Sequence, residues 1–397
     1  MNTIESYLAK AAEIDFVKPG MDIRCNVSYV AAHDVTAPIA IKQFREIGVK
    51  KVFDSERVIL FVDHIYPAST EKARDNVWIM SDFAKEFGLP IYQRGEGVIH
   101  QLMYEKYMAL PGELVVIADS HTCTCGGYGA VGIGVGSTEA AAAMAIGKLD
   151  LEVPAVLQVY LTGKPNPNVF GKDLILYLGQ LFGTNYLTDK GLLLTGPGTG
   201  YFSIEERMTV CNMGTELGSM ITLFGGQARE EDVEETREIN LGELQPKIAR
   251  PFSPANVCDV AEIAGLPITQ AVVGSCTNGR ENDMEQVAKV LYNDPVHPDV
   301  NMLVVPSSKT VLDTMEKNGW TKIIRDAGAT ILNPGCGPCF GAHEGLISQR
   351  DIVISTTNRN FPGRMGANKG QVYLASPATA AASAVAGKIT VPAIEDK

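Results

Sequence analysis

The sequence predicts an α/β protein built on parallel sheets, and three observations support this fold class. Short runs rich in Val, Ile and Leu alternate with stretches typical of helices, as in βα units whose parallel sheets are covered on both faces. The length of 397 residues leaves room for two or three domains. Polar side chains directly follow several apolar runs, and in open parallel sheets ligands bind beyond the carboxyl ends of the strands. We therefore expect the chemistry to collect at one rim.

The individual elements follow from these runs. The expected strands are Val58–Val62, Leu114–Ala118, Gln270–Val273, Met302–Val305 and Ile352–Ile354. A helix is expected over Ser137–Leu149, which opens with a Ser/Thr cap and continues through alanines, and another over Glu281–Tyr292. Ala378–Ala386 is predicted to be a closely packed helix of small residues, and the charged stretch Gln227–Pro254 a surface excursion and linker.

Composition narrows the class of protein. A hydrophobic content of 45% with 20% charged residues describes a well-packed soluble protein. The net charge of −12 disfavours a nucleic-acid or anionic-membrane partner. Charged residues interrupt the first 20 positions, so no signal peptide is expected. No uncharged run approaches the roughly 20 residues of a membrane span. We expect a cytoplasmic protein.

Three cysteines near the end of the chain are the main candidates for metal ligands. Cys276 lies in Gly274–Arg280, and Cys336 and Cys339 lie in a Pro-Gly-Cys-Gly-Pro-Cys segment. Each group follows a short apolar run, so three thiols at loop tips could hold a metal cluster and leave one coordination position open. The spacing favours such a cluster. A structural zinc site with His343 as fourth ligand and a redox dithiol are the alternatives.

The remaining five cysteines are interpreted as buried, inert thiols; they are Cys25, Cys123, Cys125, Cys211 and Cys258. Eight cysteines are too sparse for a disulfide scaffold in a chain of this length.

A glycine-rich segment, Gly127–Gly132, matches the dinucleotide-binding fingerprint. That fingerprint should begin directly after a strand, whereas Asp119–Cys125 intervenes here. The segment is therefore interpreted as a turn for close backbone packing. An NAD-dependent enzyme remains as the alternative function of another class.

Histidines and arginines supply the other candidate site residues. Asp63-His64 and Asp119-Ser120-His121 each follow an expected strand, and a neighbouring carboxylate can orient an imidazole and keep it charged as a general acid. Arg359 and Arg364 lie within one short loop, and their guanidinium groups suit carboxylate substrates.

Taken together, these motifs resemble the aconitase superfamily of iron-sulfur hydro-lyases, and specifically the isopropylmalate dehydratase large-subunit family. The resemblance runs from His33-Asp34-Val35-Thr36-Ala37-Pro38 to Tyr373-Leu374-Ala375-Ser376-Pro377. It also includes Asp63-His64, Asp119-Ser120-His121-Thr122, Cys211-Asn212-Met213, the three cysteines and Asn358–Arg364.

The resemblance implies three α/β/α domains around a 4Fe-4S cluster, without a swivelling fourth domain. The expected boundaries are 1–158, 159–266 and 267–397. It further implies that Cys276, Cys336 and Cys339 ligate the cluster and leave one iron without a protein ligand. That iron would act as a Lewis acid in dehydration.

The resemblance also implies roles for the other residues. Catalytic roles go to three histidines and their acidic neighbours: His64 with Asp63, His100 with Glu216, and His121 with Asp119. Of these, His64 would protonate the leaving hydroxyl. Substrate binding goes to His33, Ser120, Arg359 and Arg364, and support of the cluster to Asn212, Asn278 and Asn358. The family commonly has an amide where this chain has His33.

A second chain and a substrate class are implied as well. The superfamily's base is a serine on the fourth domain, so a separate small subunit is expected to carry it in a heterodimer or heterotetramer. The expected substrate is an alkylmalate, either 3-isopropylmalate or 2,3-dimethylmalate. Homoaconitase-like or aconitase-like activity is the alternative within the family.

Overall fold

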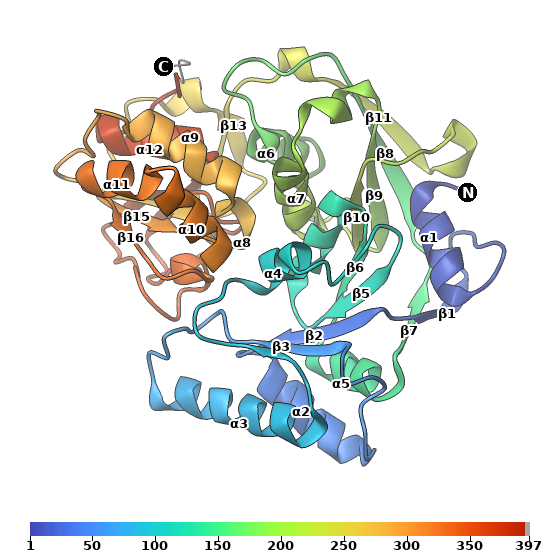
Figure 1. Ribbon diagram of the computed structural model, residues 1–397. Helices are drawn as coiled ribbons and strands as arrows, with labels where there is room; N and C mark the ends of the chain where they lie inside the picture. The colour runs from blue at the N-terminus through green and yellow to red at the C-terminus, as the bar shows by residue number, and fades with distance from the viewer. Residues whose placement is uncertain (394–397) are drawn as a thin grey trace. The chain divides into compact units, whose positions relative to one another are not determined.

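The computed structural model describes residues 1–393 (Figure 1). The chain divides into two compact units. Unit 1 comprises residues 1–94, 102–163 and 187–239, and unit 2 comprises residues 95–101, 164–186 and 240–397. The expected three-domain boundaries remain a prediction, and the last four positions of the third expected domain, 394–397, lie outside the described residues.

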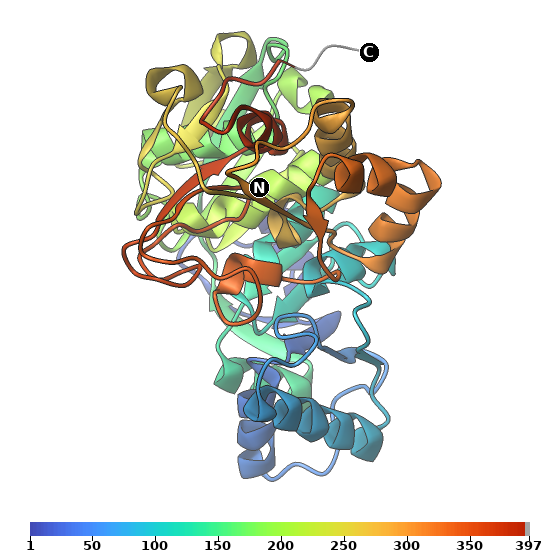
Figure 2. The ribbon, with the colours of Figure 1, turned by 90° about the vertical axis from the view of Figure 1, so that its left-hand side faces the viewer.

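The main sheet of unit 1 has five parallel strands in the order β4-β3-β2-β5-β6. They are β2 (Tyr29–His33), β3 (Val58–Phe61), β4 (Ile91–Tyr92), β5 (Leu114–Ile117) and β6 (Val131–Gly134). The associated helices are α1 (Thr3–Ala12), α2 (Ala37–Ile47), α3 (Glu71–Phe87), α4 (Ile99–Glu105) and α5 (Ser137–Ile146), of which α4 crosses the boundary between the units. Figures 1 and 2 show α2 and α3 side by side along the sheet, as the blue helices at the bottom of each view.

A second sheet of unit 1 has the order β10-β9-β8-β11. Its strands are β8 (Ala155–Thr162), β9 (Lys190–Thr195), β10 (Ile221–Phe224) and β11 (Glu235–Asn240). An antiparallel ribbon joins β1 (Asp22–Asn26) to β7 (Lys148–Glu152). Helix α7 (Ile204–Asn212) packs against the 3-10 helices η1 (Ser120–Tyr128) and η3 (Met213–Leu217).

Unit 2 is built on a seven-stranded sheet in the order β13-β12-β18-β17-β14-β15-β16, in which the five strands from β18 to β16 are parallel. The strands are β12 (Lys247–Ala249), β13 (Val257–Asp259), β14 (Gln270–Gly274), β15 (Asn301–Val305), β16 (Thr330–Ile331), β17 (Ile352–Ser355) and β18 (Gln371–Ala375). The helices are α6 (Gly171–Phe182), α8 (Ser275–Asn278), α9 (Glu281–Leu291), α10 (Lys309–Lys317), α11 (Trp320–Asp326) and α12 (Pro377–Ala386).

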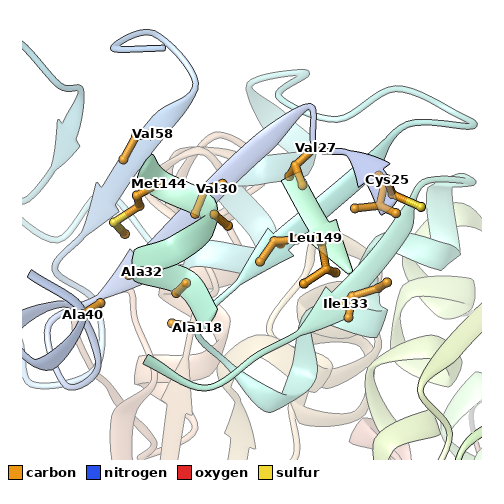
Figure 3. Close-up of a cluster of buried hydrophobic side chains, with 14 of the residues drawn as sticks. Cys25, Val27, Val30, Ala32, Ala40, Val58, Ala118, Ile133, Met144 and Leu149 are labelled. Atoms are coloured by element: carbon orange, nitrogen blue, oxygen red, sulfur yellow. The ribbon is translucent and has the colours of Figure 1, made fainter. Parts of the chain in front are cut away.

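Local sequence signals set the ends of the helices. Helix α3 begins where the Thr70 hydroxyl accepts a hydrogen bond from the Ala73 amide, and it ends at Gly88, whose φ of 69° is favourable for glycine. The hydrophobic core of unit 1 fills the space between the sheet and its helices. Figure 3 shows Val30 of β2 beside Met144 of α5 in this core.

The structure confirms the expected α/β class and all five expected strands to within one residue at each end. The helix predicted over Ser137–Leu149 ends at Ile146, because Gly147 with φ of 65° stops it and Lys148 begins β7. The prediction for Gln227–Pro254 was wrong in part, because this stretch supplies β11 and β12 to two sheets. Its charges sit on the exposed positions of β11, which explains why it did not look like a strand.

Within residues 1–393, the structure contains no helix that combines the length and the apolar character needed to cross a membrane.

The packing of α2 leads to a stability prediction. Phe44 is 1% exposed and makes edge-on ring contacts with Phe83 and Phe87. Replacing Phe44 with Ala should lower the free energy of unfolding of unit 1 by about 3–5 kcal/mol, because transfer and cavity terms add. Urea unfolding followed by Trp78 fluorescence in a Trp320→Phe background would report unit 1, since the chain has two tryptophans.

The matched control lies on the same helix. Ile39 is 56% exposed, so Ile39→Ala should change the free energy of unfolding by no more than about 0.5 kcal/mol. Equal losses from the two substitutions would contradict the assignment of Phe44 to the core.

Candidate functional site

Site residues of unit 1 gather at the carboxyl ends of three adjacent strands. His33 ends β2, Asp63 and His64 follow β3, and Asp119 follows β5. The order β3-β2-β5 places these ends next to one another, as predicted for polar residues after parallel strands. We call His33, Asp34, Asp63, His64, Asp119 and His121 the histidine site.

Asp34 shapes the loop that carries the first histidine pair. Its Oδ1 accepts hydrogen bonds from the amides of Asp63 at 3.1 Å and His64 at 2.9 Å, and its Oδ2 accepts one from Ile65 at 2.8 Å. Sequence reasoning gave Asp34 no role, although it lies next to His33 in a quoted motif. Its function is visible only when β2 and β3 are neighbours.

His64 is held as a charged imidazole. Its Nδ1 contacts Asp63 Oδ1 at 2.8 Å, and both side chains are buried. Burial alone would lower the pKa of His64, but the charge and hydrogen bond of Asp63, with the charges of Asp34 and Asp119, raise it to about 9. The ring is therefore protonated at neutral pH, and its proton on Nε2 is the one available for transfer.

His33 lies flat against His64. The two ring centroids are 3.7 Å apart with an interplanar angle of 13°. His33 Nδ1 accepts from the Val35 amide at 3.3 Å, which leaves the proton on Nε2, and that nitrogen lies 3.3 Å from Asp119 Oδ2. The same carboxylate oxygen lies 3.8 Å from His64 Nε2. Both ring nitrogens of His33 thus have protein partners.

The compactness of this group does not by itself indicate a metal site. Ligand atoms of His33, Asp34, Asp63 and His64 lie within 4.8 Å of one another. However, the oxygens of Asp34 already accept three backbone amides, and the Asp63 carboxylate holds His64. Hydrogen bonding accounts for the cluster.

His121 lies beside the expected Asp119, with its Nδ1 3.6 Å from Asp119 Oδ1, and it also has a second acidic partner. Its amide donates to Asp119 Oδ1 at 2.7 Å, while its ring Nε2 contacts Glu216 Oε1 at 3.0 Å. Glu216 is carried by η3, which packs on η1. The predicted pairing of Glu216 with His100 stays a prediction. Ser120, next to His121, is exposed.

The thiols close to the histidine site are inert, as interpreted from the sequence. Burial raises the pKa of Cys123 to about 12 and that of Cys125 to about 11, and it also raises the pKa of Cys211. These groups stay protonated at neutral pH. Asn212 lies beside them, because its side-chain amide donates to Thr124 Oγ1 at 2.9 Å.

The glycine-rich segment packs against backbone. A Cβ atom on Gly127 would lie 2.4 Å from the backbone of Met208 in α7, and one on Gly132 would lie 2.0 Å from Thr122 O. These contacts confirm the packing interpretation of the dinucleotide-like fingerprint.

The cysteines of unit 2 lie on tightly turned loops. Cys276 is the second residue of α8, which directly follows β14, and the turn requires φ of 135° at Gly274 and 69° at Ser275. A Cβ atom on Gly274 would lie 2.0 Å from Val305 O, so only glycine fits. Cys336 and Cys339 flank Gly337, whose φ is 59°.

Two of the three thiols contact Asn358, which lies in the loop after β17. Its Nδ2 donates to Cys276 Sγ at 3.5 Å, and its Oδ1 accepts from Cys339 Sγ at 3.6 Å. Hydrogen bonding to Cys339, burial, and the nearby sulfurs of Cys339 and Cys276 raise the pKa of Cys336 well above its usual value. We call Cys276, Cys336, Cys339 and Asn358 the cysteine site.

This donor set fits a metal or metal cluster. All three thiols are at least 95% buried, with exposures of 5%, 4% and 1%. Buried thiolates repel one another, so they become ionised together only when a bound cation offsets their charge. His343, the candidate fourth zinc ligand, has its Nδ1 3.4 Å from Glu344 Oε1.

Arg280 fixes the loop of Cys276, a role that sequence reasoning missed. The side chain is fully buried, and its guanidinium donates to Thr277 O and Cys276 O, both at 2.6 Å. Its Nε donates to Gln101 Oε1 at 3.1 Å. Arg280 therefore also holds Gln101, the neighbour of His100 in the chain, and both of these residues belong to unit 2.

The two arginines of the 358–364 loop differ in environment. Arg364 Nη2 lies 3.6 Å from Cys339 Sγ. Its buried Nε has no protein partner among the described residues. Arg359 is half-buried. A buried guanidinium N–H without a protein acceptor suits an anionic ligand.

Comparison with known proteins identifies the family. The family profile described as "Aconitase family (aconitate hydratase)" matches residues 8–230 and 260–387. The chain belongs to the aconitase family. It is therefore an enzyme of the hydro-lyase class, as the sequence predicted.

Relatives with curated names extend over almost the whole chain. It is 38% identical to "3-isopropylmalate dehydratase large subunit 1" of Methanopyrus kandleri, over 98% of each chain. It is 41% identical to the "3-isopropylmalate dehydratase large subunit" of Thermoanaerobacter pseudethanolicus, over 95% of each chain. Among solved structures, aconitase X of Thermococcus kodakaraensis matches with a TM-score of 0.54 and 14% identity over 93% of each chain, which shows a shared fold.

The raised pKa of His64 gives a pH-dependent stability. A pKa that folding raises from about 6.5 to about 9 contributes stability that is fully present below pH 6.5 and is lost as the pH rises through 9. The contribution is at most about 3 kcal/mol. The difference in unfolding free energy between the parent and His64→Gln should therefore shrink between pH 7 and pH 10, measured through Trp78 as above.

Asp63→Asn supplies the control for this effect. It removes the charge that raises the His64 pKa, so it should flatten the same part of the profile while leaving the imidazole in place. A parent profile that stays parallel to both variants across this range would refute the assigned pairing.

Proposed function

We propose that this chain is the large, catalytic subunit of a two-chain iron-sulfur hydro-lyase acting on an alkylmalate. The first candidate substrate is 3-isopropylmalate and the second is 2,3-dimethylmalate. The observation that carries the proposal is a group of three buried thiols, of which Cys276 and Cys339 contact Asn358 and Cys336 bonds to Cys339. It occurs in a chain whose relatives are named large subunits of 3-isopropylmalate dehydratase. Such thiols favour metal chemistry over a hydride-transfer cofactor.

Cys276, Cys336 and Cys339 would hold a 4Fe-4S cluster, with Asn278 and Asn358 supporting their loops. When bound, the cluster supplies a Lewis acid at the iron that lacks a protein ligand. The thiols are buried and mutually destabilising as anions, so the free energy of cluster binding offsets the cost of ionising them.

His64 would deliver a proton to the departing hydroxyl. Its protonated state at neutral pH follows from Asp63, which also fixes the ring through Nδ1. The Nε2 proton then remains for the substrate. His121 would be oriented by Glu216 and Asp119, and His100 would act as a further hydrogen-bonding group.

His33 is better suited to position His64 than to bind a carboxylate. It stacks on the His64 ring, and both of its nitrogens already bond to protein groups. Substrate carboxylates would instead bind Arg364, whose Nε is buried, together with Arg359 and the exposed Ser120.

A small subunit would complete the enzyme. The relatives are named large subunits, and this chain spans nearly their full length. We propose that the small subunit carries the serine base and the pocket that reads the alkyl group of the substrate.

The cysteine site gives a direct test. Protein reconstituted anaerobically with iron and sulfide should show the broad visible absorbance of thiolate-bound iron. Replacing Cys276, Cys336 or Cys339 with Ser should abolish or strongly reduce this absorbance, because each removes one of three protein ligands. Iron and sulfide analysis provides the measurement.

Cys258→Ser is the matched control, because Cys258 is 2% exposed in the same unit and its sulfur contacts Arg250 Nε at 3.1 Å. This variant should retain the absorbance. One tightly bound zinc ion per chain, in place of iron and sulfide, would sink the proposal.

The role of His64 is tested in the complex. The chain should co-purify with a coexpressed small subunit of about one domain in size, and that complex should dehydrate alkylmalates. His64→Ala should lower kcat by about 10²–10⁴-fold, because a positioned general acid contributes that much, with iron content unchanged. Unaltered turnover would remove the general-acid assignment.

A further inference from the structure

Lys172, in the first turn of α6, is a buried cation that the proposed mechanism does not use. Lys172 belongs to unit 2 and is only 1% exposed. The ammonium donates to Thr356 O at 2.7 Å, to Thr357 O at 2.8 Å and to Asn278 Oδ1 at 3.4 Å. Burying a lysine is costly, so these contacts need an explanation.

The hydrogen bonds select the protonated amine. An ammonium has three N–H donors and no acceptor, and three acceptor oxygens surround this nitrogen. A neutral amine would have two N–H groups and would leave one buried oxygen without a donor. Burial lowers the pKa of Lys172 to about 7, although the charges of Asp283, Cys339 and Cys276 oppose this fall and favour the protonated amine.

These contacts tie together the two loops that approach the cysteine sulfurs. Thr357 directly precedes Asn358, whose amide contacts the sulfurs of Cys276 and Cys339. Asn278 lies two residues beyond Cys276, and its Nδ2 donates to Asp283 Oδ1 at 2.9 Å, which directs its Oδ1 toward Lys172. The Lys172 ammonium therefore bonds to both the loop of Cys276 and the loop of Asn358.

We propose that Lys172 is a buried counter-charge of the Cys276 and Cys339 thiolates and raises the reduction potential of the cluster that the three cysteines hold. This inference rests on the proposed iron-sulfur function. Reduction adds one electron to an already anionic assembly of thiolates, sulfide and iron. A fixed positive charge in a medium of low dielectric constant stabilises the more negative state and makes that step easier.

The other two cations near the cysteine sulfurs, Arg280 and Arg364, make different contacts. Arg280 is occupied by the carbonyls of Cys276 and Thr277 and by Gln101. Arg364 is only partly buried and keeps an Nε without a protein partner. The three protons of Lys172 are all donated to protein oxygens, so this residue is a positioning and charge-balancing group that does not reach substrate.

The test is a potentiometric titration of the reconstituted complex, followed by electron paramagnetic resonance of the reduced cluster. Lys172→Met and Lys172→Gln should move the midpoint to more negative potential, enough to lower the reduced-to-oxidised ratio at a fixed poise about tenfold. Lys172→Arg keeps the positive charge, so its midpoint should stay close to that of the parent protein. Lys247→Gln is the matched control, because Lys247 is also buried in unit 2 but is paired with Asp259 at 2.5 Å.

The glutamine variant separates charge from hydrogen bonding, since it keeps N–H donors without the positive charge. Loaded Gln and Met variants with the parent midpoint would overturn the inference. If Met prevents folding, Gln and Arg decide the question alone. Parent protein that takes up no iron would refute the proposed function instead, which distinguishes the two failures.

Discussion

Burial of charge is the constraint on which the rest of the structure depends. Ionisable groups at both sites are withdrawn from water, where an isolated charge is strongly unfavourable. In unit 1, Asp63 compensates His64 and Glu216 faces His121. In unit 2, Lys172 and Arg280 satisfy the carbonyls of the loops around the cysteines. Each of these buried charges is stable only while its partners keep their positions.

The loop of Cys276 contains a strained turn. Ser275 adopts φ of 69°, which is uncommon for a residue with a side chain, immediately before Cys276. Gly274 packs against Val305 O, and a Cβ atom at this position would clash with that oxygen. Such conformations persist when surrounding contacts determine them fully, and Arg280 provides those contacts through two carbonyls of the same loop.

Asp119 has a comparable organising role in the histidine site. Its Oδ1 accepts from the His121 amide, and its Oδ2 lies within 4 Å of the Nε2 atoms of His33 and His64. The Asp119 carboxylate thus contacts three histidines, His33, His64 and His121, which lie at or beyond the ends of different strands. The stacking of His33 on His64 adds a restraint on ring tilt that a hydrogen bond alone would not give.

The sequence by itself determined the α/β class, the central strands and the three cysteines, because apolar runs, glycine-rich turns and thiol spacing are local signals. It also placed Asp63 beside His64, since they are adjacent in the chain. Only the tertiary structure paired His121 with Glu216 and brought Lys172 to the carbonyls of Thr356 and Thr357, residues separated by 95 to 185 positions. Contacts between distant segments depend on strand order and loop path, and no local pattern of residues encodes them.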